Sequence, residues 1–142
     1  MTTTTDLALN VSRTINASPE ALFNAWLDPA TLARFMRPMA DMPAPKVSND
    51  PRVGGRFDIL MTAGDKDIPH WGTYTEIVPH RHLAFTWQSP FSVEGSTVTL
   101  DFKPVPGGTQ VDLTHVKFPS EESRTNHETG WSLILATLAE IG

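Results

Sequence analysis

Cysteine is absent from this chain of 142 residues, and only one tyrosine is present. The lack of cysteine excludes disulfide bonds, thiol catalysis and cysteine-ligated metal sites. Long hydrophobic runs are missing too: the longest nearly apolar run, Leu133 to Ala139, is far shorter than the ~20 residues that cross a bilayer. The threonine run that ends at Thr5 has no basic flank, so we expect no targeting signal there and a cytoplasmic protein.

Basic charge is scarce as well. Lysine and arginine number 11 against 16 acidic residues, which gives a net charge of −5. Such a chain is a poor partner for nucleic acid or for an anionic membrane. The nucleotide motifs GxGxxG and Walker A, the zinc motif HExxH and the nucleophile motif G-x-S-x-G are all missing. We therefore expect no cofactor, no bound metal and no membrane span.

The composition is that of a folded domain. Hydrophobic residues make up 39% of the chain, and 9 glycines bring the apolar share close to that of ordinary soluble domains. Global disorder is excluded on this ground. The length predicts one domain over residues 1–142, with residues 1–5 disordered.

Alternation of apolar and polar residues predicts a series of strands. The alternating segments are residues 6–15, 46–49, 56–62, 70–78, 82–88, 96–103 and 110–118. Turn signals such as Gly54-Gly55 and Pro106-Gly107-Gly108 separate them, and residues 63–67 read as a hairpin loop. Strands this close together are typical of an antiparallel meander rather than of parallel β-α-β units.

Three helices are predicted from start signals and periodicity. Ser18-Pro19-Glu20 begins a short helix to about Leu27, and Asp28-Pro29 begins a second that ends before Pro38. Ser120 begins a helix of about 20 residues, or ~30 Å, near the C-terminus. The sequence thus predicts an α+β fold: a curved antiparallel sheet wrapped around a long C-terminal helix, with two short helices after the first strand.

Four stretches resemble a known superfamily. They are Ile15 to Trp26, Asp50 to Phe57, Gly72 to Trp87, and Leu113-Thr114-His115 together with His127 to Trp131. Their order and spacing are similar to the START/Bet v 1-like (SRPBCC) superfamily. Within it, they resemble the activator of Hsp90 ATPase homologue 1-like C-terminal domain family.

This resemblance implies a helix-grip fold with a cavity between the long helix and the sheet. The chain departs from the pattern in two ways. It ends at Gly142, where many relatives continue, and it lacks the upstream domain of eukaryotic Hsp90 activators.

Two of the five histidines are candidates for a cavity. His115 alternates in phase with Leu113, which predicts that it points inward, and His127 lies one turn before Trp131 on the same helix face. Two interpretations are open for these histidines: they contact a ligand in the cavity, or they are hydrogen-bonded within the core. Glu128 is expected on another helix face. His80 and His82 are predicted in a solvated turn, because two local histidines are too few for a metal site.

The chain is rich in large side chains that either pack the core or line a hydrophobic pocket. The candidate ligand-binding residues are Trp26, Phe35, Phe57, Met61, Trp71, Trp87, His115, His127 and Trp131. No catalytic residue is assigned.

Three functions remain open. The first is binding of a small hydrophobic or amphipathic ligand between the C-terminal helix and the sheet. The second is an enzyme of the cyclase, dehydratase or hydrolase type in the same cavity, with His115 and His127 as the acid–base pair. The third is regulation of an Hsp90-type chaperone, against which the missing upstream domain counts. A protein partner or a second copy of the chain is compatible with each.

Overall fold

The computed structural model describes residues 7–37, 43–90 and 92–141. The predicted disorder of residues 1–5 lies outside this part of the chain. The elements are β1 (Ala8–Ile15), α1 (Pro19–Leu27), α2 (Pro29–Phe35), β2 (Lys46–Asn49), β3 (Arg56–Ala63), β4 (Lys66–Val78), β5 (His82–Thr86), β6 (Thr97–Val105), β7 (Gly108–Val116) and α3 (Glu121–Ile141).

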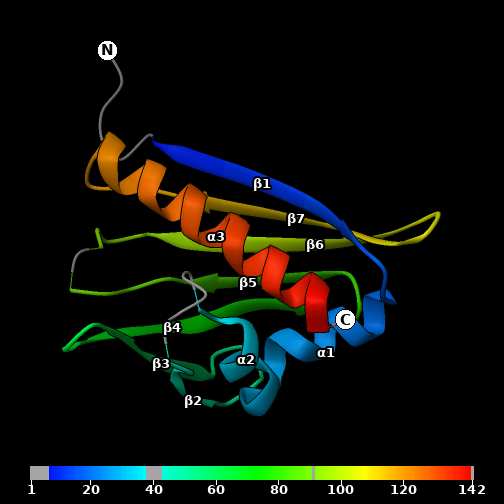
Figure 1. Cartoon of the computed structure of the whole chain (residues 1–142), viewed down its shortest axis with the longest axis horizontal. Coiled ribbons are helices and arrows are strands. Elements are labelled where there is room, and N and C mark those ends of the chain that lie inside the picture. Colours follow the sequence, from blue (N-terminus) through cyan, green and yellow to red (C-terminus); the bar gives the residue numbers. More distant parts are fainter. Residues whose placement is uncertain (1–6, 38–42, 91, 142) are drawn as a thin grey trace.

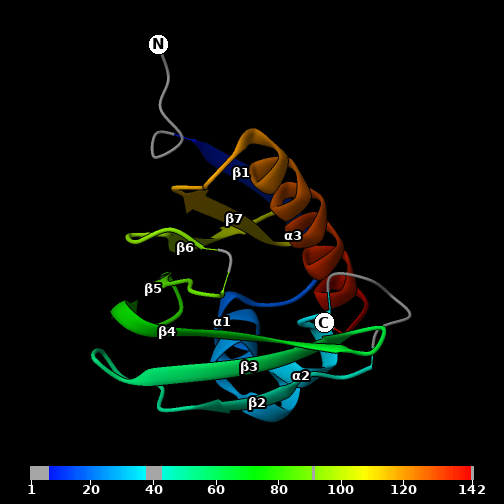
Figure 2. The same cartoon turned by 90° about the vertical axis from the view of Figure 1, so that its left-hand side faces the viewer.

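The strands form one antiparallel sheet in the order β1-β7-β6-β5-β4-β3-β2. Strands β2 to β7 form a meander, because each of them pairs with the next strand in the sequence. The first strand, β1, pairs with β7 and is an edge strand of the sheet. The helix α3 runs diagonally across one face of the sheet, and α1 and α2 lie near its C-terminal end (Figure 1). Seen from the side, the sheet curves around α3 (Figure 2). This is the predicted α+β helix-grip arrangement.

Some element boundaries differ from those predicted. The loop predicted at residues 63–67 is a tight turn, and β4 begins at Lys66 instead of residue 70. Gly64 makes this possible, because its φ of 66° lies in the left-handed region that a short hairpin turn requires. In the middle of the sheet, β5 ends at Thr86, two residues before the predicted end. After β5, the backbone N–H of Trp87 donates to the carbonyl oxygen of Ser96, and that of Gln88 donates to the carbonyl oxygen of Trp71.

The predicted caps begin each helix. Ser18 Oγ accepts from the backbone N–H of Ala21, and Asp28 Oδ2 accepts from that of Thr31. At α3, Ser120 Oγ accepts from Ser123 N–H. A proline follows the cap at the start of both α1 and α2, where its fixed φ suits the first helical position.

The core lies between α3 and the concave face of the sheet, closed at one end by α1 and α2. Trp131, Ile134, Leu135 and Leu138 form the buried stripe of α3. Buried residues of the other strands meet this stripe in one cluster with Trp26 and other side chains of α1 and α2, and the partly buried Val47 of β2 packs against it. Within the described residues, no helix is long and apolar enough to cross a membrane.

The outer face of the sheet carries the charges. Arg56 forms an exposed pair of hydrogen bonds with Asp58, two residues along β3. His82 does not lie in a solvated turn as predicted: it begins β5, where Nδ1 lies 2.7 Å from Asp101 and Nε2 lies 2.9 Å from Glu76. The register of the sheet explains the difference, because it places His82 directly across from Asp101 on β6.

His82 makes the stability of the sheet depend on pH near neutrality. Its hydrogen bond to Asp101, helped by Glu76, raises the pKa of His82 above 6.5. The protonated form therefore stabilises the fold fully below pH 6.5, and this contribution is lost as pH rises through the folded-state pKa. We expect His82→Gln to cost about 0.5–1 kcal/mol of unfolding free energy at pH 6 and less at pH 8.5, measured by urea unfolding. A cost that is the same at both pH values would contradict this.

Candidate functional site

A cleft of about 160 Å³ opens between the N-terminal half of α3 and strands β3 to β5. It is lined by Met61, His70, Trp87, Asn126, His127, Gly130, Trp131 and Ile134. A cavity of about 150 Å³ with apolar walls holds benzene, so this cleft has room for one aromatic ring or a short aliphatic chain. Its walls are mostly apolar, and its polar side chains come from one strand and one turn of α3.

The sheet side of the cleft follows from strand alternation. Ile59 on β3 pairs with His70 on β4, so His70 shares the inward face with Ile59 and with Met61. Trp87 follows β5 and packs against His70, with ring centroids 5.1 Å apart. On the helix side, Gly130 carries no side chain, and this leaves the space open between α3 and the sheet.

Four of the nine predicted ligand-binding residues line this cleft: Met61, Trp87, His127 and Trp131. The other five do not. Trp26 and Phe57 border a neighbouring narrow pocket of only about 10 Å³, room for about one water molecule. Phe35 is fully buried against Trp26, with ring centroids 5.0 Å apart. The interior near α1 and α2 is therefore filled.

Trp71 lies on the other face of the sheet. Trp71 pairs with Asp58 on β3, and the side chain of Asp58 bonds Arg56 on the outer face of the sheet. His70, the residue before Trp71, points inward. Side chains alternate along a strand, so Trp71 cannot line the same cleft as His70. The alternation of apolar and polar residues correctly predicted this strand. The prediction of Trp71 as a cleft residue rests on its aromatic character, and aromatic character does not show which face of a strand a side chain is on.

His115 points inward, as its alternation predicts, and is 1% exposed. It lies behind Trp131 rather than on the cleft. The indole N–H of Trp131 donates to Nδ1 of His115 at 3.0 Å, and Nε2 lies 2.7 Å from Ser96 Oγ. Because an indole N–H can only donate, Nδ1 carries no proton, so Nε2–H donates to Ser96. Both ring nitrogens are thus engaged inside the protein.

Burial, together with a smaller contribution from the nearby His127, lowers the pKa of His115 to about 3. His115 is neutral in the folded protein at physiological pH. With both nitrogens engaged, it is not placed to exchange a proton with a molecule in the cleft. Its ring meets that of His127 edge-on at 5.3 Å, so the predicted pair does come together, but through ring contact.

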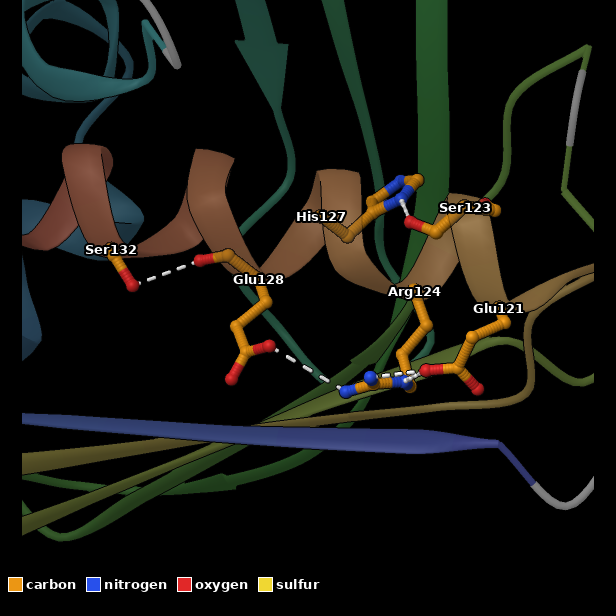
Figure 3. Close-up of polar contacts among 6 residues, drawn as sticks. All are labelled: Glu121, Ser123, Arg124, His127, Glu128 and Ser132. Atoms are coloured by element: carbon orange, nitrogen blue, oxygen red, sulfur yellow. Dashed lines mark hydrogen bonds and ion pairs between the residues drawn. The ribbon is translucent and has the colours of Figure 1, made fainter.

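His127 is the histidine of this pair that faces the cleft. Its Nδ1–H donates to the carbonyl oxygen of Ser123 at 2.8 Å, one turn earlier in α3 (Figure 3). A carbonyl can only accept, so the neutral ring carries its proton on Nδ1 and leaves Nε2 as an acceptor. Nε2 of His127 has no hydrogen-bond partner among the described residues.

The charged side chains of this part of α3 lie on a different face from His127. Arg124 bonds Glu121 and lies 3.5 Å from Glu128, while Ser132 Oγ donates to the Glu128 carbonyl (Figure 3). Glu128 is turned away from His127, as predicted. The cleft wall of α3 is therefore free of these charges.

The sequence interpretation missed His70 as a cleft residue. Burial lowers the pKa of His70 to about 4, so it is neutral there, and its Nδ1 donates to the carbonyl of Ile68 at 3.1 Å. A signal existed, because His70 is in phase with the inward residues Gly72 and Tyr74. Asn126 and Ile134 were missed as well, since helical periodicity does not show where a cleft opens.

Comparisons with known proteins place this geometry in a family. The sequence model of the family described as Activator of Hsp90 ATPase homolog 1-like protein matches residues 16–142. The chain belongs to this family. A curated mouse relative, Activator of 90 kDa heat shock protein ATPase homolog 1, is 27% identical over 126 residues, which are 87% of this chain and 33% of the mouse protein. The chain thus spans about a third of the length of that relative.

Solved structures of family relatives share the fold. A crystal structure of a protein from Chromobacterium violaceum has a TM-score of 0.85 and 25% identity, covering 94% of this chain and 95% of the other. A solution structure of an AHSA1-like protein from Aeromonas hydrophila has a TM-score of 0.80 and 27% identity, covering 94% and 90%.

In residues 7–37, 43–90 and 92–141 of this chain, no group of three or more His, Asp or Glu side chains could hold a metal ion.

Buried, neutral His115 makes this family member sensitive to acid. Its folded-state pKa lies below the unfolded value of 6.5, so the unfolded chain binds more protons and stability falls as pH drops from 6.5 toward 3. We expect wild type to lose about 2 kcal/mol more than His115→Gln between pH 6.5 and 4.5. Glutamine is the matched change, because it can accept from Trp131 and donate to Ser96 without titrating.

Urea unfolding of both proteins over this pH range measures the difference. The variant starts less stable, because it loses the ring contact with Phe118, and the two stability curves converge as the pH falls. Parallel curves would show that His115 does not carry the acid sensitivity.

Proposed function

We propose that this protein binds a small hydrophobic or amphipathic molecule in the cleft between α3 and strands β3 to β5. The observation that carries the proposal is a mostly apolar cleft of about 160 Å³ between α3 and the sheet. Apolar walls with a few polar groups that fix orientation are typical of small-molecule sites. Met61, Trp87, Trp131 and Ile134 supply the walls in this proposal.

His127 supplies the polar contact. Its unpartnered Nε2 accepts a hydrogen bond from a ligand hydroxyl or amide N–H while the ring is neutral. The exposed Asn126 adds an amide at the mouth of the cleft. An amphipathic ligand would place its apolar part between Met61, Trp131 and Ile134, with a polar group within reach of these two residues.

Filling the cleft from α3 tests the proposal. Gly130→Leu places a side chain in the space that a ligand would occupy, so we expect the affinity for the probe ethylbenzene to fall at least tenfold. Stability should not fall, because glycine inside a helix costs ~1 kcal/mol relative to a good helix former such as leucine. Chemical-shift titration of ¹⁵N-labelled protein gives the affinity, and urea unfolding gives the stability.

Thr129→Leu is the matched control, since it adds a leucine at the neighbouring, exposed position of α3. It should leave the affinity for ethylbenzene unchanged. If Gly130→Leu binds the probe as tightly as wild type does, ligands bind elsewhere and the proposal fails. Native mass spectrometry of the purified protein, beside a denatured control, would then identify the class of any natural ligand as a mass that denaturation releases.

A second candidate function is regulation of an Hsp90-type chaperone. It is favoured by the match to the mouse activator, which spans 87% of this chain. In this case the protein should raise the ATPase rate of a 90 kDa heat shock protein severalfold at saturating concentration, measured by phosphate release. Gly130→Leu should retain this effect, because the cleft would not be the interacting surface. An unchanged ATPase rate would eliminate this candidate.

A further inference from the structure

Two buried tryptophans have no partner for their indole N–H. Nε1 of Trp26 and Nε1 of Trp87 are fully buried, each in a residue 3% exposed, and neither has a hydrogen-bond acceptor among the described residues. An indole N–H is a donor only, and leaving it buried and unpaired costs free energy. Trp131 shows the ordinary solution in the same core, because its N–H donates to His115.

The two tryptophans border the same space. Trp26 and Trp87 both line the narrow pocket of about 10 Å³, which has room for about one water-sized group. Trp87 also lines the cleft, so the narrow pocket and the cleft adjoin at this residue. Trp131 packs against both rings, with centroids 5.0 Å from Trp87 and 6.4 Å from Trp26.

The surroundings select a neutral acceptor over a charged one. No lysine, arginine, aspartate, glutamate or histidine lines the narrow pocket in the part of the chain that the structure describes. A carboxylate in that pocket would therefore lack a counter-ion, which makes its desolvation unfavourable. A carbonyl oxygen carries no charge and accepts two hydrogen bonds, so one such oxygen can serve both indole donors.

We propose that the ligand of this cleft carries a neutral carbonyl group, such as that of a ketone or an ester, whose oxygen accepts the indole N–H of Trp87 and of Trp26. The inference rests on the proposed function and adds the chemical class of the ligand. The apolar part occupies the cleft, about one aromatic ring in size, and the oxygen lies at the Trp87 wall. Trp87 is the specificity-determining residue of the site.

The experiment compares two probes of nearly equal shape. Acetophenone carries a carbonyl oxygen that ethylbenzene lacks. The chain has four tryptophans, so its ¹H–¹⁵N spectrum contains four indole signals, which single Trp→Phe variants assign. We expect acetophenone to shift the Trp87 and Trp26 indole signals downfield and ethylbenzene to leave them without that shift. Trp71, on the other face of the sheet, is the internal control.

The variant Trp87→Phe keeps an aromatic ring and removes the donor. We expect the ratio of the dissociation constants of acetophenone and ethylbenzene to rise about three- to tenfold relative to wild type. The cost of desolvating the carbonyl cancels in this comparison, because it is the same for both proteins. Trp71→Phe should leave the ratio unchanged. If Trp87→Phe does not fold, the spectra of the wild-type protein decide alone.

The outcomes separate the two proposals. If ethylbenzene binds but acetophenone does not move the Trp87 signal downfield, or if the ratio is unchanged in Trp87→Phe, the carbonyl inference is overturned and the proposed function stands. Binding of neither probe overturns both. Benzoate at pH 8 tests neutrality: weaker binding than acetophenone supports the inference, and tighter binding overturns it.

Discussion

The attachment of Trp131 to the sheet is the contact on which the core and the cleft both depend. One side chain makes a polar contact, from its N–H to His115 on β7, and an apolar contact, from its ring to Trp87. Together they fix the rotation of α3 about its own axis. His127, one turn earlier, therefore faces the sheet, and Gly130 lies beside the open space. Ser96 completes the arrangement, because its hydroxyl accepts from His115 and holds that ring in one tautomer.

This constraint divides the interior into two unequal parts. Near α1 and α2, aromatic rings such as Trp26, Phe35 and Phe57 fill the space between helix and sheet almost completely. Toward the start of α3, the helix presents a glycine and a histidine instead, and the packing stays open. The size of any ligand is thus set by how far the aromatic packing extends, and its orientation is set by the polar groups that line the cleft.

The fold alone does not decide what such a protein does, because the same scaffold serves different functions. The side chains at the cleft carry more information. His70 and His115 are held neutral by burial, and the hydrogen bonds of His115 are all internal, so the site offers apolar walls, one available histidine nitrogen and unpaired indole donors. These groups are suited to holding a neutral, weakly polar molecule. The sequence match to the mouse Hsp90 ATPase activator covers 87% of this chain and says nothing about this chemistry.

The amino-acid sequence by itself determined the architecture, because its signals are local. Period-two alternation set the strands, Ser18, Asp28 and Ser120 set the helix starts, and the phase of His115 set its inward direction. Only the tertiary structure decided where space remains. Trp26 and Trp87 read alike in the sequence, yet one packs the filled interior and the other walls the cleft. The difference comes from long-range packing: residues as far apart as Met61, His70 and His127 meet only when α3 docks on the sheet, and no local pattern records how completely their side chains fill the space between.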